Sequence, residues 1–160
     1  MSDPQTARRT DVEAVGEREI RCERVFDAPR EKVFAAFIDP ELIPQWWGPH
    51  DSKVTVDVME VRNGGSWRFV HSGPQGVTGF RGTFREITPP ERVVQTFEWE
   101  GMPGHVAVDT AEFDDLGDQT RVRISSLFHT TEERDGMLGS GMERGLNESH
   151  ERLDALLAAS

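Results

Sequence analysis

Six strand-like segments follow one another between residues 54 and 128 with no helical segment among them. Each combines β-branched or aromatic residues with charged ones; they cover residues 54–61, 66–71, 78–87, 92–100, 105–113 and 119–128. The links between them are too short for the crossovers that parallel strands need, so the segments predict an antiparallel meander. A chain of 160 residues then fits one α+β domain, in which the rest of the chain covers one face of the sheet.

Helical segments flank this meander on both sides. Before it, residues 19–26 alternate like a first strand, and 27–29 and 39–41 each give a helix-start signal for a short helix. After it, Thr130 with Glu133 and Ser140 with Glu143 resemble capping boxes separated by glycines. We therefore expect a short helical turn, a break and a main helix over about 140–158. Residues 1–17 are polar and aperiodic and predict a disordered tail ahead of a single domain over 18–160.

Charge and cysteine content restrict the possible partners. Lysine and arginine total 18 against 29 acidic residues, a formal net charge of −11, which repels nucleic acid and anionic membrane surfaces. The single cysteine, Cys22, excludes an intrachain disulfide and a cysteine-based metal site. No signal-peptide core or membrane-length apolar run occurs, so a cytoplasmic location is expected.

Motifs for metal, phosphate or cofactor chemistry do not occur. The five histidines have no metal-ligand spacing, and the glycines at 64–65 and 73–76 belong to hairpins with no helix after them. No Gly-x-Ser-x-Gly sequence is present. Neither a metal nor a cofactor is expected.

Several short motifs resemble the SRPBCC superfamily of START-like, helix-grip proteins. The opening of the domain, 25–34 followed by Trp46-Trp47-Gly48-Pro49, is similar to that superfamily. The segments 63–69, 89–94, 120–122 and 141–145 are similar to its branch named for the activator of the heat-shock chaperone ATPase (AHSA-like). The resemblance implies a sheet of six to seven strands wrapped around a long C-terminal helix, with a ligand cavity between them. Chaperone activators carry a further N-terminal docking domain, so a chaperone partner is not expected here.

Strand parity predicts which side chains face that cavity. Arg68, Arg81 and Glu98 should face solvent, which turns their aromatic neighbours inward. On the main helix, Gly139, Gly141 and Gly145 should leave space opposite these rings, with adaptable methionines beside them. The predicted ligand-pocket residues are Trp67, Phe69, Phe80, Phe84, Gln95, Phe97, Trp99, Met137, Met142 and Leu146.

Three functions fit these residues. The first is an intracellular protein that binds a small hydrophobic or aromatic molecule without catalysis. The second is a cyclase-like or hydrolase-like enzyme in the same cavity, with His71 and Asp109 as candidate catalytic residues within hydrogen-bond reach. The third is a stress-associated or chaperone-associated protein that works through an exposed apolar patch around Trp46, Trp47 and Pro49. A homodimer is compatible with each.

Overall fold

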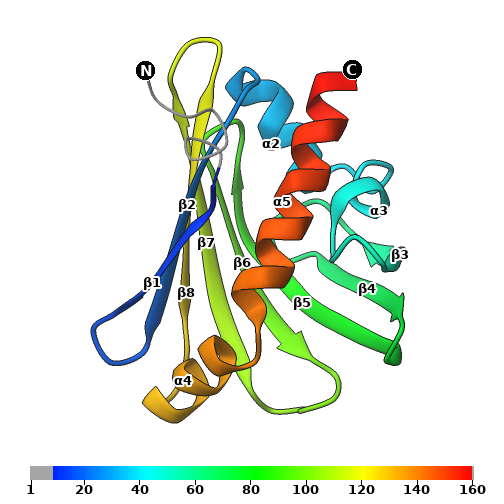
Figure 1. The fold of residues 1–160 in the computed structure, drawn as a ribbon, viewed down its shortest axis with the longest axis vertical. Helices are drawn as coiled ribbons and strands as arrows, with labels where there is room; N and C mark the ends of the chain where they lie inside the picture. The colour runs from blue at the N-terminus through cyan, green and yellow to red at the C-terminus, as the bar shows by residue number, and fades with distance from the viewer. Residues whose placement is uncertain (1–8, 160) are drawn as a thin grey trace.

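The computed structural model describes residues 9–159 as a curved, eight-stranded antiparallel sheet that wraps around a long helix (Figure 1). The strand order is β1-β2-β8-β7-β6-β5-β4-β3. The strands are β1 (Asp11–Val15), β2 (Glu19–Phe26), β3 (Lys53–Met59), β4 (Ser66–Gly73), β5 (Gly76–Thr88), β6 (Arg92–Trp99), β7 (Val106–Asp115) and β8 (Thr120–Leu127). The α+β helix-grip fold predicted from the sequence is confirmed.

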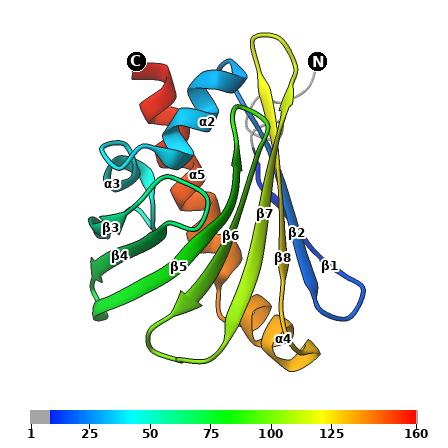
Figure 2. The same ribbon diagram turned by 180° about the vertical axis from the view of Figure 1, so that it is seen from behind.

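The helices formed by residues 9–159 all lie on one side of the sheet, and none of them covers the other side (Figure 2). They are α2 (Arg30–Ile38), α3 (Ile43–Trp46), α4 (Thr131–Gly139) and α5 (Met142–Ala159). The predicted cap of α4 forms, because the Thr130 side chain accepts a hydrogen bond from the backbone N–H of Glu133. No helix within residues 9–159 is long and apolar enough to cross a membrane.

The prediction of a disordered tail over 1–17 is wrong for the part that the structure describes. Residues 11–15 form β1, which pairs with β2 from Asp11 opposite Glu23 to Val15 opposite Glu19. The segment has only five residues, in which Val12 and Ala14 alternate with Asp11 and Glu13, and so short an alternation next to a polar stretch is a weak strand signal. The sheet therefore has eight strands, one more than the upper limit predicted. Residues 1–8 lie outside the described residues.

The buried apolar residues fall into two clusters. The larger cluster includes Phe26, Trp67, Phe84 and Leu153, and it lies under α2, α3 and the C-terminal half of α5. The smaller cluster consists of Ile20, Ala107 and Phe128, with Met137, Leu138 and Met142 of the α4–α5 region packed against it. Because neither cluster covers the middle of the inner face of the sheet, that region is where a site can form.

Candidate functional site

A row of polar side chains crosses the inner face of the sheet between the two clusters. Gln95 of β6 lies opposite Asp109 of β7, and Asp109 lies opposite Ser126 of β8. Directly opposed residues share a face, so the three side chains form one continuous row over three adjacent strands. The row continues to Ile20 of β2 and Phe84 of β5, both of which are buried. This row is thus polar at its centre and apolar at both of its ends.

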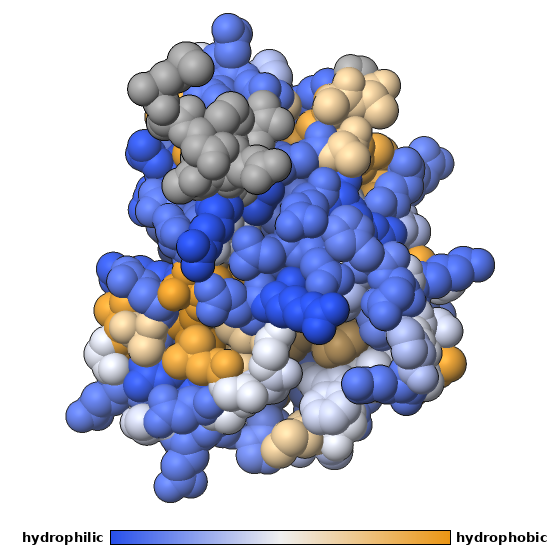
Figure 3. Space-filling view, viewed as in Figure 1, coloured by the Kyte–Doolittle hydropathy of each residue, from blue (hydrophilic) through white to orange (hydrophobic). Residues whose placement is uncertain are grey.

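Members of this row are only half-buried although they lie on central strands beneath the helices. Gln95, Asp109 and Ser126 each keep part of their surface accessible, as do Phe97 of β6 and Leu146 of α5. Leu146 packs against neither buried cluster. Apolar side chains also reach the surface in the lower part of the helix-covered side, above α4 (Figure 3). The middle of the inner face therefore offers accessible apolar surface beside polar groups.

Asp109 has an unusual electrostatic environment. Burial raises the pKa of its carboxyl group to about 6, although a hydrogen bond with Ser126 acts in the opposite direction. Asp109 forms no ion pair with any of the residues that the structure describes. A carboxyl group in such a position exchanges its proton close to neutral pH.

The ten predicted ligand-pocket residues differ in how deeply their side chains are buried. Trp67, Phe69 and Phe84 are at most 4% exposed and pack in the larger cluster, so they offer a ligand almost no surface. Trp99 is 40% exposed, and its indole N–H donates to the Thr78 hydroxyl. The half-buried members are Phe80, Gln95, Phe97, Met137, Met142 and Leu146.

The predicted catalytic pair does not form. His71 is on β4 and Asp109 on β7, with β5 and β6 between them. At about 4.8 Å per strand, their backbones lie roughly 14 Å apart across the sheet. Asp109 bonds to Ser126 instead, and the His71 ring lies near Gly48 and Gly73 at the far edge. Both side chains face inward as predicted, but from positions too far apart for direct proton transfer.

The glycines of the α4–α5 region do not face the aromatic residues as expected. Gly139 and Gly141 are exposed at the junction of the two helices, and a Cβ at either would meet nothing within 4 Å. Gly141 has a φ of +84°, so it serves the turn between the helices. Gly145 faces Pro49, whose Cγ would lie 3.8 Å from an added Cβ. The accessible inner surface therefore comes from the gap between the clusters and owes nothing to these glycines.

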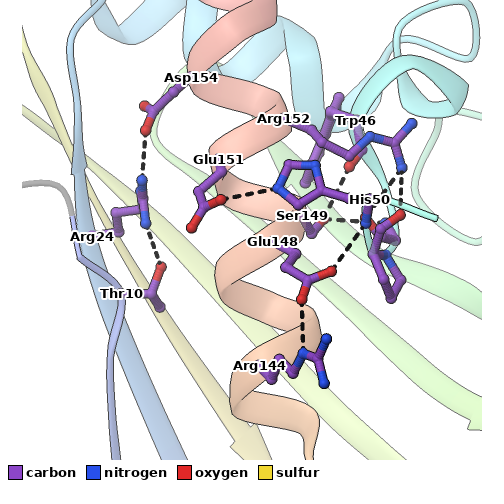
Figure 4. A network of polar contacts seen from close by, with 12 residues as sticks. Thr10, Arg24, Trp46, His50, Arg144, Glu148, Ser149, Glu151, Arg152 and Asp154 are labelled. Carbon is purple, nitrogen blue, oxygen red and sulfur yellow. Dashed lines mark hydrogen bonds and ion pairs between the residues drawn. The ribbon is translucent and has the colours of Figure 1, made fainter. Parts of the chain in front are cut away.

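Sequence reasoning missed a buried polar group at the upper end of the inner face. The Arg24 side chain, 4% exposed, donates to Asp154 of α5 at 2.5 Å and to the Thr10 hydroxyl at 3.1 Å (Figure 4). Thr10 also bonds to Nδ1 of His150, which is 2% exposed. Burial and the nearby Arg24 lower the pKa of His150 to about 3, so its ring is neutral. The sequence signal for this group was Arg24, a charged residue at an inward-facing position of the strand between Cys22 and Phe26.

The segment from Trp46 to Pro49 is held against α5, so the expected exposed patch is not present. Trp46 is 3% exposed and donates its indole N–H to the carbonyl of Ala36. Arg152 of α5 donates to the carbonyls of Trp47, Gly48 and Pro49 (Figure 4). Trp47 and Pro49 are half-buried. This arrangement removes the surface that the interaction-protein hypothesis required.

The outer face of the sheet carries a hollow of its own, and the described residues form no metal cluster. Within residues 9–159, no group of three His, Cys, Asp or Glu side chains could hold a metal ion. A hollow of about 630 Å³ lies on the outer face of β1, β2, β7 and β8, and its lining includes Glu19, Arg21, Glu112 and Arg123. Burial raises the pKa of the nearby Cys22 thiol to about 12, which makes it unreactive. The lining of this hollow combines charged side chains with the apolar side chains of Val12 and Ile124.

The fold and the inner face together define a helix-grip protein with accessible apolar surface between sheet and helix. The family described as Activator of Hsp90 ATPase homolog 1-like protein matches residues 27–158. The chain therefore belongs to this family, and the resemblance noted in its motifs is confirmed. No match to a curated protein was found.

Several solved structures share the whole fold. A protein from Arthrobacter aurescens is 27% identical, with a TM-score of 0.85 over 94% of this chain and 92% of that one. A protein from Rhodobacter sphaeroides is 26% identical, with a TM-score of 0.85 over 94% and 98% of the two chains. DynU16, a protein of the dynemicin biosynthetic locus, is 18% identical with a TM-score of 0.68. This chain covers 48% of DynU16, and that likeness concerns the fold alone.

Proposed function

We propose that this protein binds a small, mainly apolar or aromatic molecule on the inner face of the sheet, beneath α5. The observation that carries the proposal is the division of the core into two clusters with half-buried residues between them. Interiors of proteins are close-packed, and a central strand under a helix normally buries its inner side chains. Gln95 and Phe97 nevertheless keep part of their surface accessible at this position.

The composition of this region suits a small-molecule site. Such sites are mostly apolar with a few polar groups that set orientation. Here Phe97, Met142 and Leu146 supply apolar surface, and the row Gln95–Asp109–Ser126 supplies donors and acceptors. Methionine side chains adapt to ligands of different shape. Family membership also supports the proposal, because a helix-grip fold provides a ligand site between its sheet and its long helix.

A neutral apolar fluorophore, N-phenyl-1-naphthylamine, tests the proposal. Its emission should rise when it is titrated with the protein, because it leaves water for the inner face. Leu146→Arg places a charged side chain into this space and should weaken probe binding at least tenfold, about 1.4 kcal/mol.

Leu127→Arg is the matched control. Leu127 is 44% exposed on β8 and lies opposite Val108, on the outer face. Probe affinity should be unchanged in this variant. Equal losses in both variants, or no emission change with the unmodified protein, would show that the inner face binds no apolar ligand.

A further inference from the structure

The charges of the inner face are balanced at one end and unbalanced at its centre. At the upper end Arg24 is paired with Asp154, and the ring of His150 beside it is neutral. At the centre Asp109 has only the neutral Ser126 and Gln95 across its strand pairs. An ionised carboxylate with no cation beside it is costly in apolar surroundings. The centre of the inner face therefore lacks one positive charge.

No side chain of the described residues supplies that charge. Of the cations on neighbouring elements, Arg24 bonds to Asp154, and Arg134 of α4 bonds to the carbonyls of Gly16 and Glu19 and to Asp135. The Cys22 thiol, whose pKa is raised by burial and by the Asp109 charge, is neutral. His71 lies on the distant strand β4. Asp109 is half-buried as a residue.

Aromatic surface lies beside Asp109. Phe97 is two residues from Gln95 on the same face of β6, and it pairs with Ala107, two residues from Asp109. It is thus the diagonal neighbour of Asp109, about 7–8 Å away between backbones. Aromatic faces attract cations as well as apolar groups. Farther along β6, Trp99 adds a partly exposed ring.

We infer that the ligand of the proposed site is an apolar molecule with a protonated amine or similar cationic nitrogen, which pairs with the Asp109 carboxylate. This inference rests on the proposed function and names the chemistry of its ligand. The nitrogen lies between Asp109 and the Phe97 ring, with Ser126 and Gln95 as neutral hydrogen-bond partners. The apolar part extends toward Met142 and Leu146. The formal net charge of −11 also favours the approach of a cation.

Two probes of the same size separate this inference from the proposed function. They are 1-naphthylmethylamine, which is cationic, and 1-naphthylmethanol, which is neutral. We expect the amine to bind at least tenfold more tightly than the alcohol at pH 7.5 in 0.15 M salt, where attraction by distant surface charges is screened. With a carboxyl pKa of about 6, about 97% of Asp109 is ionised at pH 7.5 and about 9% at pH 5. Affinity for the amine should therefore fall roughly tenfold at pH 5, whereas affinity for the alcohol should not fall.

Asp109→Asn should remove the preference for the amine and leave the affinity for the alcohol within about twofold. Asp118→Asn, in the exposed turn between β7 and β8, changes the net charge equally and should preserve the preference. If Asp109→Asn does not fold, the pH dependence of the unmodified protein still decides the question. Equal binding of both probes at pH 7.5 would overturn the inference and leave the proposed function standing. A preference that survives in Asp109→Asn would overturn the assignment to Asp109. If neither these probes nor N-phenyl-1-naphthylamine binds, the proposed function itself fails.

Discussion

Asp109 lies on the inner face of a central strand without a compensating cation among residues 9–159, and this has a consequence for stability. Burial raises the pKa of its carboxyl group from 3.8 to about 6. The folded protein therefore binds a proton more tightly than the unfolded chain does. Stability linked to this group is fully present below pH 3.8 and is lost as the pH rises through 6. The folded protein carries this cost at neutral pH, where the carboxyl group is ionised.

Asp109→Asn should consequently stabilise the ligand-free protein at pH 7.5, by up to about 3 kcal/mol. The gain should shrink toward zero as the pH falls from 6 to 4, since the native carboxyl group is then protonated. Urea unfolding at a series of pH values measures both effects, with Asp118→Asn as the control. A variant less stable than the unmodified protein at pH 7.5 would show that Asp109 is compensated within the fold.

The ion pair between Arg24 and Asp154 should be important for stability. Asp154→Ala leaves the Arg24 guanidinium buried with Thr10 and without its carboxylate, which should cost about 3 kcal/mol. Arg144→Ala removes an exposed pair with Glu148 on the same helix and should cost about 0.5 kcal/mol or less. Urea unfolding of the two variants gives the comparison. Similar free energies of unfolding would mean that Arg24 is solvated by other groups.

For individual residues, the sequence predicts which face of the sheet a side chain lies on better than how deeply the side chain is buried. Arginine positions predicted correctly that Phe80 and Phe84 face inward, and the position of Glu98 predicted the same for Phe97 and Trp99. They gave no indication that Phe84 is buried and Phe97 accessible, because depth depends on which part of α5 lies above each ring. Asp109 was recognised as inward-facing, but its hydrogen-bond partner was not, because strand register decides which residues are opposed.

Among the elements, the α4–α5 junction is the clearest case of a local rule that decides a boundary. The two helices are separated at Gly141, whose positive φ suits glycine. Gly136 lies inside α4 with nothing within 4 Å of an added Cβ. The break predicted from the glycines is therefore confirmed, although only Gly141 requires its glycine for backbone reasons.

Alanine substitution at these two glycines should have opposite effects. Gly136→Ala should stabilise the protein by about 0.5–1 kcal/mol, because alanine restricts the unfolded chain and favours the helix. Gly141→Ala should destabilise it by about 1–2 kcal/mol, because a side chain is strained at this φ. Thermal unfolding of both variants measures the difference. A stabilising Gly141→Ala would mean that α4 and α5 can join as one continuous helix.

Seven of the strands, β2 to β8, and the main helix were predictable because alternation and helical periodicity are local signals. β1 was not, since an edge strand of mixed polar sequence is fixed by its partner strand. Its position also depends on Thr10, which bonds to His150 and Arg24 from segments far along the chain. Contacts between residues so far apart in the sequence cannot be recognised from a local sequence pattern.

On the scale of the whole molecule, the fold places a long helix across a curved sheet and fills only the two ends of the space between them. The larger cluster anchors α5 at its C-terminal half, and the smaller cluster anchors the α4–α5 region. Between the two clusters lies the polar row of Gln95, Asp109 and Ser126 on the inner face of the sheet. A protein built in this way holds its helix firmly while keeping accessible surface at the middle of the inner face.

Amide chemical-shift mapping with N-phenyl-1-naphthylamine is the most direct test for a ligand site between the sheet and the helix. Saturable shifts should be centred on Gln95, Phe97, Asp109 and Ser126 of the sheet and on Leu146 of α5. No comparable shifts should occur around Leu127 on the outer face. Shifts confined to the outer face, or no saturable shifts at all, would contradict a ligand site between the sheet and the helix.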